Sequence, residues 1–381
     1  MKFFHLGDLH IGKVVNRFSM LDDQRHALSQ VLAYVRQEKP DAVVIAGDVY
    51  DKPMPTTEAV QLFDDFLTGL AGLDVCVMLI SGNHDSAERL SFAGRLLRER
   101  NVHIYSLFDG TPHTVTLKDT HGACHFHLLP FIKPAHVRGY FPGREINSYG
   151  TAMEAVLSAK DIDASTRNVL VAHQFVTAPG SDPERSDSEV EPVGGLDGIS
   201  TALFGAFDYV ALGHLHGPQR IGRDSVRYAG SLLKYSFSEC FHQKGIASVE
   251  MGKKGDLQIT RLPLSPLRDM RKIRGPVAEL TSPEVVASGN PEDYLHVTLT
   301  DPHEIIDAMG KLRAVYPHVM ELAFDNARTR AQSSFTQAAL VENRSPLELF
   351  SDFYEGQNGE PPTAGQMQVL SAIMKAVEDM P

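Results

Sequence analysis

Residues 42–51 read AVVIAGDVYD, and this stretch contains the pattern that decides the fold. Five apolar residues have the length and composition of a buried strand, and Gly47-Asp48 follows them directly. The N-terminus repeats the arrangement, because the strand-like segment 2–6 is followed by Gly7-Asp8-Leu9-His10. Short strands that end in a side chain able to bind a metal ion are therefore a recurring feature of this chain.

The same segments indicate the fold class. Six have the composition of short strands, namely 2–6, 42–46, 75–80, 125–129, 169–172 and 209–212. Residues 22–37 and 57–70 place apolar residues at three- and four-residue intervals, which is typical of helices that pack on a sheet. Thr56 or Thr57 can cap the second helix. We expect a layered α/β domain whose ligands gather at the carboxyl ends of its strands.

Five strand ends carry side chains that bind metals. A single His or Asp in a turn is more often a helix cap or a solvated residue, but five such ends are hard to obtain by chance. The seven candidate ligands are Asp8, His10, Asp48, Asn83, His173, His214 and His216. Seven ligands are too many for one tetrahedral zinc ion and none is a thiolate, so we expect a pair of divalent cations.

The types of ligand limit which metal ions and which reactions fit the site. Carboxylate, imidazole and amide ligands favour Mn²⁺, with Mg²⁺, Fe or Zn²⁺ as alternatives that depend on supply. Two ions about 3.5–4 Å apart can clamp the attacking and leaving oxygens of an in-line displacement at phosphorus. A metal-bound water would then be the nucleophile, so the chain needs no nucleophilic Ser, Cys or Lys. The implied reaction is hydrolysis of a phosphate ester.

The five strand-end blocks, in this order, resemble the calcineurin-like metallophosphoesterases. That family's pattern is D-x-H, G-D-x-x-D, G-N-H-D/E, an isolated H, and G-H-x-H. Further segments resemble the SbcD family of nuclease subunits within it. These are AGDVYD at 46–51, SGNHDS at 81–86, VGGLD at 193–197, DYVALGHLH at 208–216, RYAGS at 227–231 and SPLELF at 345–350. The resemblance covers nearly the whole chain, with Gly7 standing where the pattern usually has Ser.

The resemblance assigns roles to the candidate residues. One metal would be held by Asp8, His10 and His216, and the second by Asn83, His173 and His214, with Asp48 bridging the two. His84 would be catalytic and contact the scissile phosphate, either as a transition-state stabiliser or as an acid toward the leaving oxygen. The alternative is that His84 only orients a ligand or Asp85. Asp85 is interpreted as a supporting residue that fixes the His84 tautomer or a neighbouring ligand.

The resemblance also implies a function. It predicts a metal-dependent DNA nuclease, both exonuclease and endonuclease, that acts with an SbcC-type ATPase on DNA ends and hairpins in repair, recombination and replication. A homodimer is expected, with helices 22–37 and 57–70 as candidate contacts. The alternatives are a phosphatase or phosphodiesterase on the same fold, or a metal-free scaffold. Phosphatases of this kind have Arg shortly after the second block and Glu after G-N-H, where this chain has Lys52 and Asp85.

The expected fold is therefore α/β, a layered metallophosphoesterase β-sandwich flanked by helices, with a small α+β capping domain and C-terminal helices. The predicted boundaries are 1–268 for the nuclease domain, 269–335 for the capping domain and 336–381 for helices that dock the ATPase. In the capping domain we expect strands at 295–299 and 319–324 and a helix at 303–315 that begins at Asp301-Pro302. Ser345-Pro346 begins a helix, which the glycines and prolines of 356–365 interrupt before a second, apolar helix.

Charge and composition limit the partners and the compartment. The net charge of -12 argues at first against nucleic acid, but residues 271–381 carry -7 of it. Segment 253–274 has seven basic residues against two acidic ones and is equally compatible with a solvated linker and a phosphate-contacting edge. No apolar run approaches the ~18 residues of a membrane span. With three cysteines, no CxxC pair and no signal-peptide core, we expect a cytoplasmic protein without a membrane partner.

Overall fold

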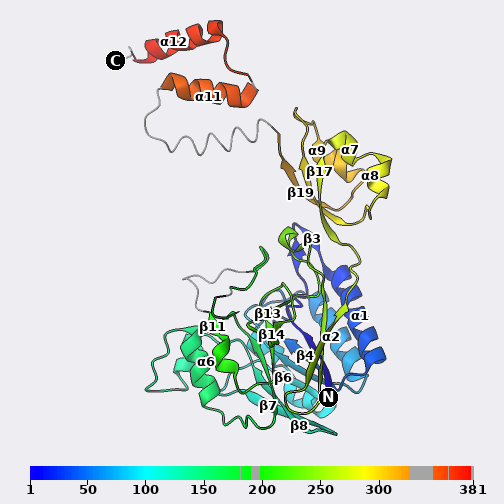
Figure 1. Cartoon of the computed structure of the whole chain (residues 1–381). Coiled ribbons are helices and arrows are strands. Elements are labelled where there is room, and N and C mark those ends of the chain that lie inside the picture. The colour runs from blue at the N-terminus through cyan, green and yellow to red at the C-terminus, as the bar shows by residue number, and fades with distance from the viewer. Residues whose placement is uncertain (181, 190–197, 327–345, 359, 379–381) are drawn as a thin grey trace. The chain divides into compact units, whose positions relative to one another are not determined.

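The chain divides into two units, Met1–Asp269 and Met270–Pro381. The structure, a computed structural model shown in Figure 1, describes residues 1–180, 182–189, 198–326, 346–358 and 360–378. The VGGLD segment at 193–197, the helix cap predicted at Ser345 and the domain boundary predicted at residue 335 lie outside the described residues.

Two six-stranded sheets form the first unit, in the orders β16-β15-β1-β4-β5-β6 and β13-β14-β12-β9-β8-β7. The first contains β1 (Lys2–Leu6), β4 (Ala42–Ala46), β5 (Cys76–Ile80), β6 (Val102–Tyr105), β15 (Gly245–Met251) and β16 (Leu257–Pro263). The second contains β7 (His113–Asp119), β8 (Gly122–Leu129), β9 (Arg167–His173), β12 (Tyr209–Gly213), β13 (Gln219–Ile221) and β14 (Arg223–Tyr228). The central strands β1, β4, β5 and β6 run parallel, as do β8, β9, β12 and β14.

Helices cover the outer faces of the sheets. Helices α1 (Leu21–Glu38) and α2 (Thr57–Ala71) pack side by side, and α6 (Tyr149–Ser158) lies on the opposite side of the unit in Figure 1. Because both faces of the central strands are covered, every residue of β4, β5, β9 and β12 is buried. The predicted layered α/β fold is confirmed. Thr56 caps α2 as expected, since its side chain accepts a hydrogen bond from the Ala59 amide.

Short elements complete the first unit. They are β2 (Val14–Val15), β3 (Phe18–Ser19), α3 (Ala87–Leu90), α4 (Gly94–Leu97), α5 (Pro134–Arg138), β10 (Val176–Thr177), β11 (Ile199–Ser200) and the 3₁₀ turns Arg98–Arg100, Thr201–Phe204 and Phe237–Glu239. No helix among the described residues is both long enough and apolar enough to span a membrane.

The second unit begins with a parallel three-stranded sheet in the order β17-β18-β19. Its elements are β17 (Met270–Gly275), α7 (Val277–Leu280), α8 (Pro283–Ala287), β18 (Tyr294–Leu299), α9 (Ala308–Arg313) and β19 (Val319–Phe324). The predicted start of the helix at Asp301 is wrong. The Asp301 carboxylate accepts a hydrogen bond from the Val277 amide at the start of α7, and α9 begins instead after Asp307, whose side chain accepts from the Gly310 amide.

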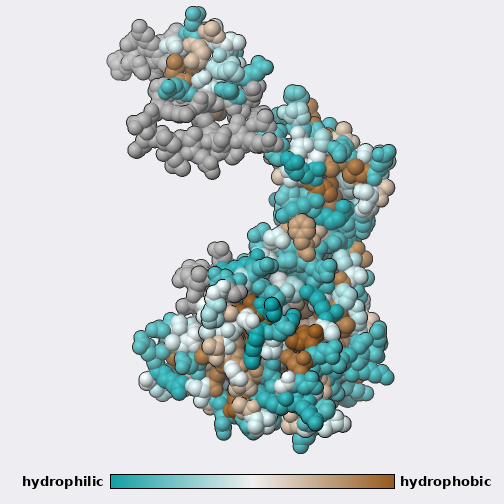
Figure 2. Space-filling model, in the orientation of Figure 1, coloured by the Kyte–Doolittle hydropathy of each residue, from teal (hydrophilic) through white to brown (hydrophobic). Residues whose placement is uncertain are grey.

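Two helices end the described chain, α11 (Pro346–Asn358) and α12 (Ala364–Glu378). They contact each other, and the Gln366 side chain donates a hydrogen bond to the Tyr354 hydroxyl. Helix α11 continues through Gly356, so the predicted interruption begins later than expected. Phe353 and Ile373 expose 45% and 55% of their surfaces, and Figure 2 shows apolar surface on these helices.

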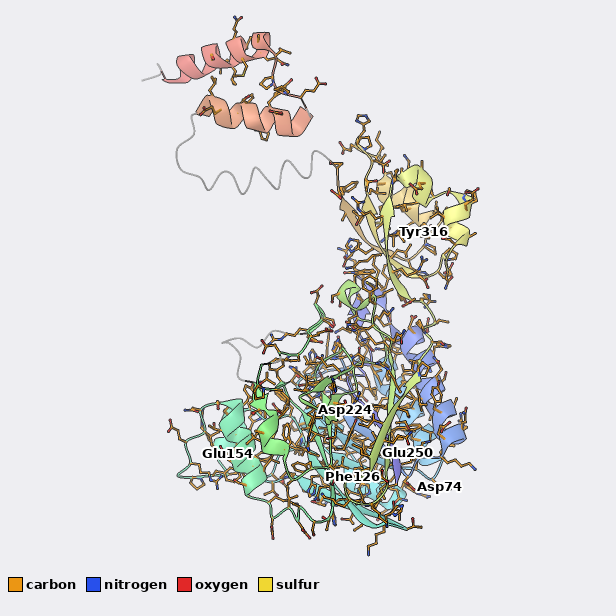
Figure 3. All side chains as sticks on the ribbon, in the orientation of Figure 1. Asp74, Phe126, Glu154, Asp224, Glu250 and Tyr316 are labelled. Atoms are coloured by element: carbon orange, nitrogen blue, oxygen red, sulfur yellow. The ribbon has the colours of Figure 1, made fainter. Side chains whose placement is uncertain are left out.

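Phe126, labelled in Figure 3, provides a test of the core between the two sheets. It is fully buried on β8 and packs edge to face on Phe3 of β1, with ring centroids 5.2 Å apart. Replacing a buried Phe by Ala removes its transfer free energy and leaves a cavity, at a cost of about 3–5 kcal/mol. We expect Phe126→Ala to lower the free energy of unfolding by this amount in urea titration. A loss below about 1 kcal/mol would contradict the packing described.

His5 provides a second test, of pH dependence. The ring is fully buried, its Nδ1 lies 3.0 Å from the Tyr209 hydroxyl, and burial lowers the pKa of His5 to about 3. The unfolded chain therefore binds this proton between about pH 6.5 and pH 3 when the folded chain does not. Stability should fall with decreasing pH across that range by up to ~1.4 kcal/mol per unit from this residue. When the free energy of unfolding is measured against pH, His5→Asn should show a shallower slope than the wild type over this range. An identical slope would contradict the assignment of this pH dependence to His5.

Candidate metal centre

The ends of five strands meet in the first unit and bring the predicted ligands together. The residues come from the segments after β1, β4 and β5 of one sheet and from the end of β9 and the segment after β12 of the other. Three overlapping groups have ligand atoms within 4.8 Å of one another: Asp8, His10 and His216; His10, Asp48 and His84; and Asp8, Asp48 and His173. Asn83 and His214 join them through the contacts described below.

The first group is Asp8, His10 and His216. All three side chains are almost completely buried. The Nε2 atoms of His10 and His216 lie 3.0 Å apart, directed at the same point. Two neutral imidazoles can share this position only if one nitrogen carries a hydrogen or if both lone pairs bind a cation.

The second group is Asn83, His173 and His214. The Asn83 side-chain oxygen is 3.0 Å from His173 Nε2 and 3.0 Å from His214 Nδ1. His173 Nδ1 lies 2.8 Å from the carbonyl oxygen of Ala46. Because a carbonyl can only accept, this nitrogen carries the hydrogen, and Nε2 is the atom that faces the group.

Asp48 connects the two groups. Its Oδ2 is 3.5 Å from His10 Nε2 in the first group and 3.3 Å from His173 Nε2 in the second. Its Oδ1 accepts a hydrogen bond of 2.9 Å from the His84 amide. One carboxylate thus contacts both halves of the centre, which is the position that a bridging ligand requires.

The backbone beneath the centre is strained. Asp8, His10 and Asp48 have φ values of 53°, 45° and 51°, and His214 has 112°. Such values are uncommon for residues other than glycine and cluster at functional sites when the surrounding structure holds them. Here the hydrogen bonds from the Asp8 amide to the Gly47 carbonyl and from the His10 amide to the Asp48 carbonyl hold the first two segments against each other.

Close approach also explains two glycines. A Cβ atom on Gly82 would overlap the Asp48 carboxylate, and one on Gly47, whose φ is 88°, would come within 2.5 Å of His173 Nδ1. The glycines that precede the candidate ligands therefore allow the two strand-end segments to come into contact.

His84 and Asp85 lie beside Asp48 but contact different partners. His84 Nδ1 is 2.9 Å from the carbonyl oxygen of Asp51, so this carbonyl, and not Asp85, fixes the His84 hydrogen position. The Asp85 carboxylate accepts hydrogen bonds from the amides of Val49, Tyr50 and Gly82. Asp85 therefore ties the segment after β4 to the segment after β5.

Burial controls the charge states of the candidate ligands. It raises the pKa of Asp8 well above its ordinary value and lowers the pKa of His10, while burial and then His173 lower the pKa of His214 to about 3. For His173 the carboxylates of Asp48 and Asp8 outweigh burial, and its pKa rises to about 9. Most of the imidazoles are thus neutral at pH 7, which is the form that binds a metal ion.

Unsatisfied polar atoms fit the same conclusion. Among the described residues, Asp8 Oδ2 is a buried atom of the first group that has no hydrogen-bond partner. The donor set contains oxygen and nitrogen only, and Cys76, Cys124 and Cys240 are free thiols outside it. A buried carboxylate oxygen without a partner is a group that a divalent cation can satisfy.

The basic segment 253–274 is mostly ion-paired. Lys254, Arg268, Arg271 and Arg274 form salt bridges with Asp208, Asp23, Asp293 and Asp325, respectively. These pairs favour the linker interpretation for those four side chains, because their charges are already engaged by carboxylates of this chain.

Sequence reasoning missed several residues that contact the centre. Ser188 and Glu239 lie next to the His216 ring, and Glu189 accepts a hydrogen bond of 2.7 Å from the His216 amide. They come from segments that no spacing rule links to the strand-end pattern, so only the fold brings them to His216.

Comparisons with known proteins agree with the pattern of the centre. The calcineurin-like phosphoesterase family model matches residues 1–218, and that of the type 5 capsule protein repressor C-terminal domain matches residues 266–358. The SbcD subunit of nuclease SbcCD from Staphylococcus epidermidis is 30% identical over 383 residues, which span 100% of this chain and 99% of that protein.

Two solved structures are also similar. A Thermus thermophilus protein is 11% identical, with a TM-score of 0.40; the match covers 68% of this chain and 98% of that protein's chain. A dimetal phosphatase from Danio rerio has a TM-score of 0.39 and 13% identity over 70% of this chain and 99% of its own.

Cation binding at Asp48 should be visible as a change in stability. At a hundredfold excess over Kd, a ligand of the folded state adds about 2.7 kcal/mol to the free energy of unfolding. We therefore expect Mn²⁺ to raise the Tm of the metal-free chain by about 5 °C or more. Asp48→Asn, which keeps the shape and removes the charge, should lose most of this shift.

The matched control for Asp48→Asn is Asp161→Asn, an exposed aspartate in the segment after α6. It should keep the full Mn²⁺-dependent shift in differential scanning fluorimetry. An Asp48→Asn chain that Mn²⁺ stabilises as strongly as the wild type would contradict the central position of Asp48.

Proposed function

Because the chain belongs to the SbcD nucleases of the calcineurin-like phosphoesterase family, we propose that it hydrolyses DNA phosphodiester bonds at the centre built around Asp48. The observation that supports this proposal most directly is geometric. Two groups of ligands from five strand ends share one carboxylate, and all but the half-buried Asn83 and His214 are buried. A partly exposed imidazole, His84, lies beside that carboxylate. Hydrolysis of a phosphate ester by two metal ions requires these groups and does not require a nucleophilic side chain.

In this proposal Asp8, His10 and His216 hold one divalent cation, Asn83, His173 and His214 hold a second, and Asp48 contacts both. Bound there, the pair would supply Lewis acidity toward phosphate oxygens and lower the pKa of water. Mn²⁺ suits the mixture of carboxylate, imidazole and amide donors, and Mg²⁺, Fe or Zn²⁺ are the alternatives.

His84 is the proposed catalytic residue. The Asp51 carbonyl accepts from Nδ1, so the ring is held while Nε2 remains for the substrate. The edge-to-face contact with His10, at a centroid distance of 4.8 Å, places the ring next to the ligand groups. When protonated, His84 can donate from Nε2 to a phosphate oxygen or to the leaving oxygen without losing its bond to Asp51. Asp85 supports this geometry through the amides that it binds.

The C-terminal helices are the proposed contact with the ATPase. Phe350, Phe353, Val369 and Ile373 each expose more than a third of their surface in the α11–α12 pair. Exposed apolar residues on an amphipathic helix pair fit the groove or coiled coil of a partner. The Staphylococcus epidermidis relative, which is named as a subunit of SbcCD, indicates the kind of partner. That partner is an SbcC-type ATPase, which acts with the chain on double-stranded ends and hairpins in the cytoplasm.

A homodimer formed through α1 and α2 remains part of the proposal. On α2 the apolar residue Val60 is 45% exposed, and Met54, just before this helix, is 72% exposed. Both are apolar surface that a second copy of the chain would cover.

Replacement of His84 tests the catalytic assignment. We expect His84→Gln to reduce Mn²⁺-dependent cleavage of linear and hairpin double-stranded DNA by about 10²–10⁴-fold, the usual contribution of a general acid or base. The Mn²⁺ content, measured by atomic emission after gel filtration, should remain that of the wild type because His84 is not a proposed ligand. His121→Gln, a change of an exposed histidine in the β7–β8 turn, is the matched control.

Two results would contradict the proposal. If the wild-type chain cleaves neither substrate, with or without its ATPase, the nuclease assignment is wrong. If His84→Gln instead loses bound Mn²⁺ in parallel with activity, His84 is a ligand and not the group that acts on the phosphate.

A further inference from the structure

A chain of hydrogen bonds leads away from His216, on the side opposite the proposed cations. His216 Nδ1 lies 2.7 Å from the Ser188 hydroxyl, and that hydroxyl donates a bond of 2.6 Å to Glu239 Oε1. Glu239 Oε2 accepts a bond of 2.6 Å from the Lys244 ammonium. Glu239 is fully buried, and Lys244 is only 6% exposed. A carboxylate and an ammonium are thus both buried behind one histidine.

The chemistry of these groups fixes where each hydrogen lies. An ionised carboxylate only accepts, so the single hydroxyl hydrogen of Ser188 points to Glu239. The Ser188 oxygen must then accept from His216, which places the imidazole hydrogen on Nδ1. Nε2 is left with its lone pair, and Nε2 is the atom that faces His10 at 3.0 Å.

Lys244 closes the arrangement. Its three hydrogens have three acceptors, namely Glu239 Oε2 at 2.6 Å, the His216 carbonyl at 2.8 Å and the Ser231 hydroxyl at 2.8 Å. Lys244 therefore compensates the charge of Glu239 and also holds the backbone of His216. A buried ion pair rarely gains stability over apolar residues of similar volume, so its presence here needs a local reason.

The segment that carries Ser188 is itself fixed at this place. The Asp187 amide donates to the Ser238 hydroxyl at 2.9 Å, and Glu189 Oε1 accepts from the His216 amide at 2.7 Å. Ser188 thus lies between two anchored neighbours, one on each side. These two bonds hold the backbone on either side of Ser188 in addition to the bond between its hydroxyl and the His216 ring.

We propose that Ser188, Glu239 and Lys244 are positioning residues that hold His216 as the Nδ1–H tautomer with Nε2 directed at the cation. The Ser188 hydroxyl is oriented by its bond to the Glu239 carboxylate and in turn orients the His216 imidazole. Lys244 holds the Glu239 carboxylate in place. This inference rests on the proposed metal centre and adds to it the groups that orient one of its ligands.

Removal of the bridge is the direct test. Ser188→Ala deletes one oxygen and leaves the Glu239–Lys244 pair intact. Loss of a group that orients a metal-bound histidine typically weakens metal affinity about 10–100-fold. Titration of the full metal-free chain with Mn²⁺ by isothermal calorimetry should show this loss at one of the two ions. Ser188→Thr, which keeps the hydroxyl, should restore most of the affinity.

Ser236→Ala is the matched control. The Ser236 hydroxyl also donates to Glu239 Oε1, at 3.0 Å, but it does not contact His216. Its removal should change the Mn²⁺ affinity less than about threefold, well below the effect expected at Ser188. The Tm of each metal-free variant should be measured beside the affinity, because a purely structural role would lower Tm equally in both serine variants and leave Mn²⁺ affinity unchanged.

A second variant covers the buried pair. Glu239→Gln alone leaves Lys244 without its counter-charge, so the double change Glu239→Gln/Lys244→Met is used to keep the interior neutral. We expect it to fold and still to bind Mn²⁺ at least about tenfold more weakly than the wild type. Wild-type affinity in both Ser188→Ala and the double variant would overturn the inference.

The titration also separates this inference from the proposed function. If the wild-type chain itself binds no Mn²⁺, the proposed metal centre is wrong. If the wild type binds two ions and both Ser188→Ala and the double variant bind them with equal affinity, the centre stands and only the positioning role is lost.

Discussion

Two buried carboxylates, Asp8 and Asp48, lie among four imidazoles, and the first unit is organised around keeping them there. Burial opposes their ionisation, and a carboxylate in a protein interior is costly unless a positive charge compensates it. His173 supplies part of that compensation. For Asp48 the neighbouring histidines outweigh burial and hold its pKa below the ordinary value, whereas one oxygen of Asp8 has no hydrogen-bond partner among the described residues. A cation is the simplest group that satisfies these atoms together.

The two sheets provide the rigidity that this arrangement requires. Each candidate ligand lies at or just after the end of a strand that has a paired neighbour on either side, and this pairing fixes the backbone. That support allows Asp8, His10 and Asp48 to adopt φ values that isolated residues avoid. The same closeness explains why Gly82 faces the Asp48 carboxylate. The packing of the two strand-end segments against each other therefore accounts both for the strained backbone and for the position of the candidate ligands.

Much of this could be predicted from local sequence. The strand before Asp48 is a continuous apolar run followed by a glycine, and it has this composition because both faces of its sheet are covered. Edge strands such as β7 and β16 alternate between exposed and partly buried residues and were not recognised. Asp301 was misread because its carboxylate caps α7, which is distant in sequence. The groups behind His216 were missed for the same reason, since they are joined only by tertiary contacts.

We propose that Asp48 joins two cation sites. Anomalous diffraction from crystals of the full chain grown with Mn²⁺ tests it most directly. We predict two peaks, one beside Asp8, His10 and His216 and the other beside Asn83, His173 and His214, with the Asp48 carboxylate in contact with both. A single peak, or two peaks of which neither contacts Asp48, would contradict the account.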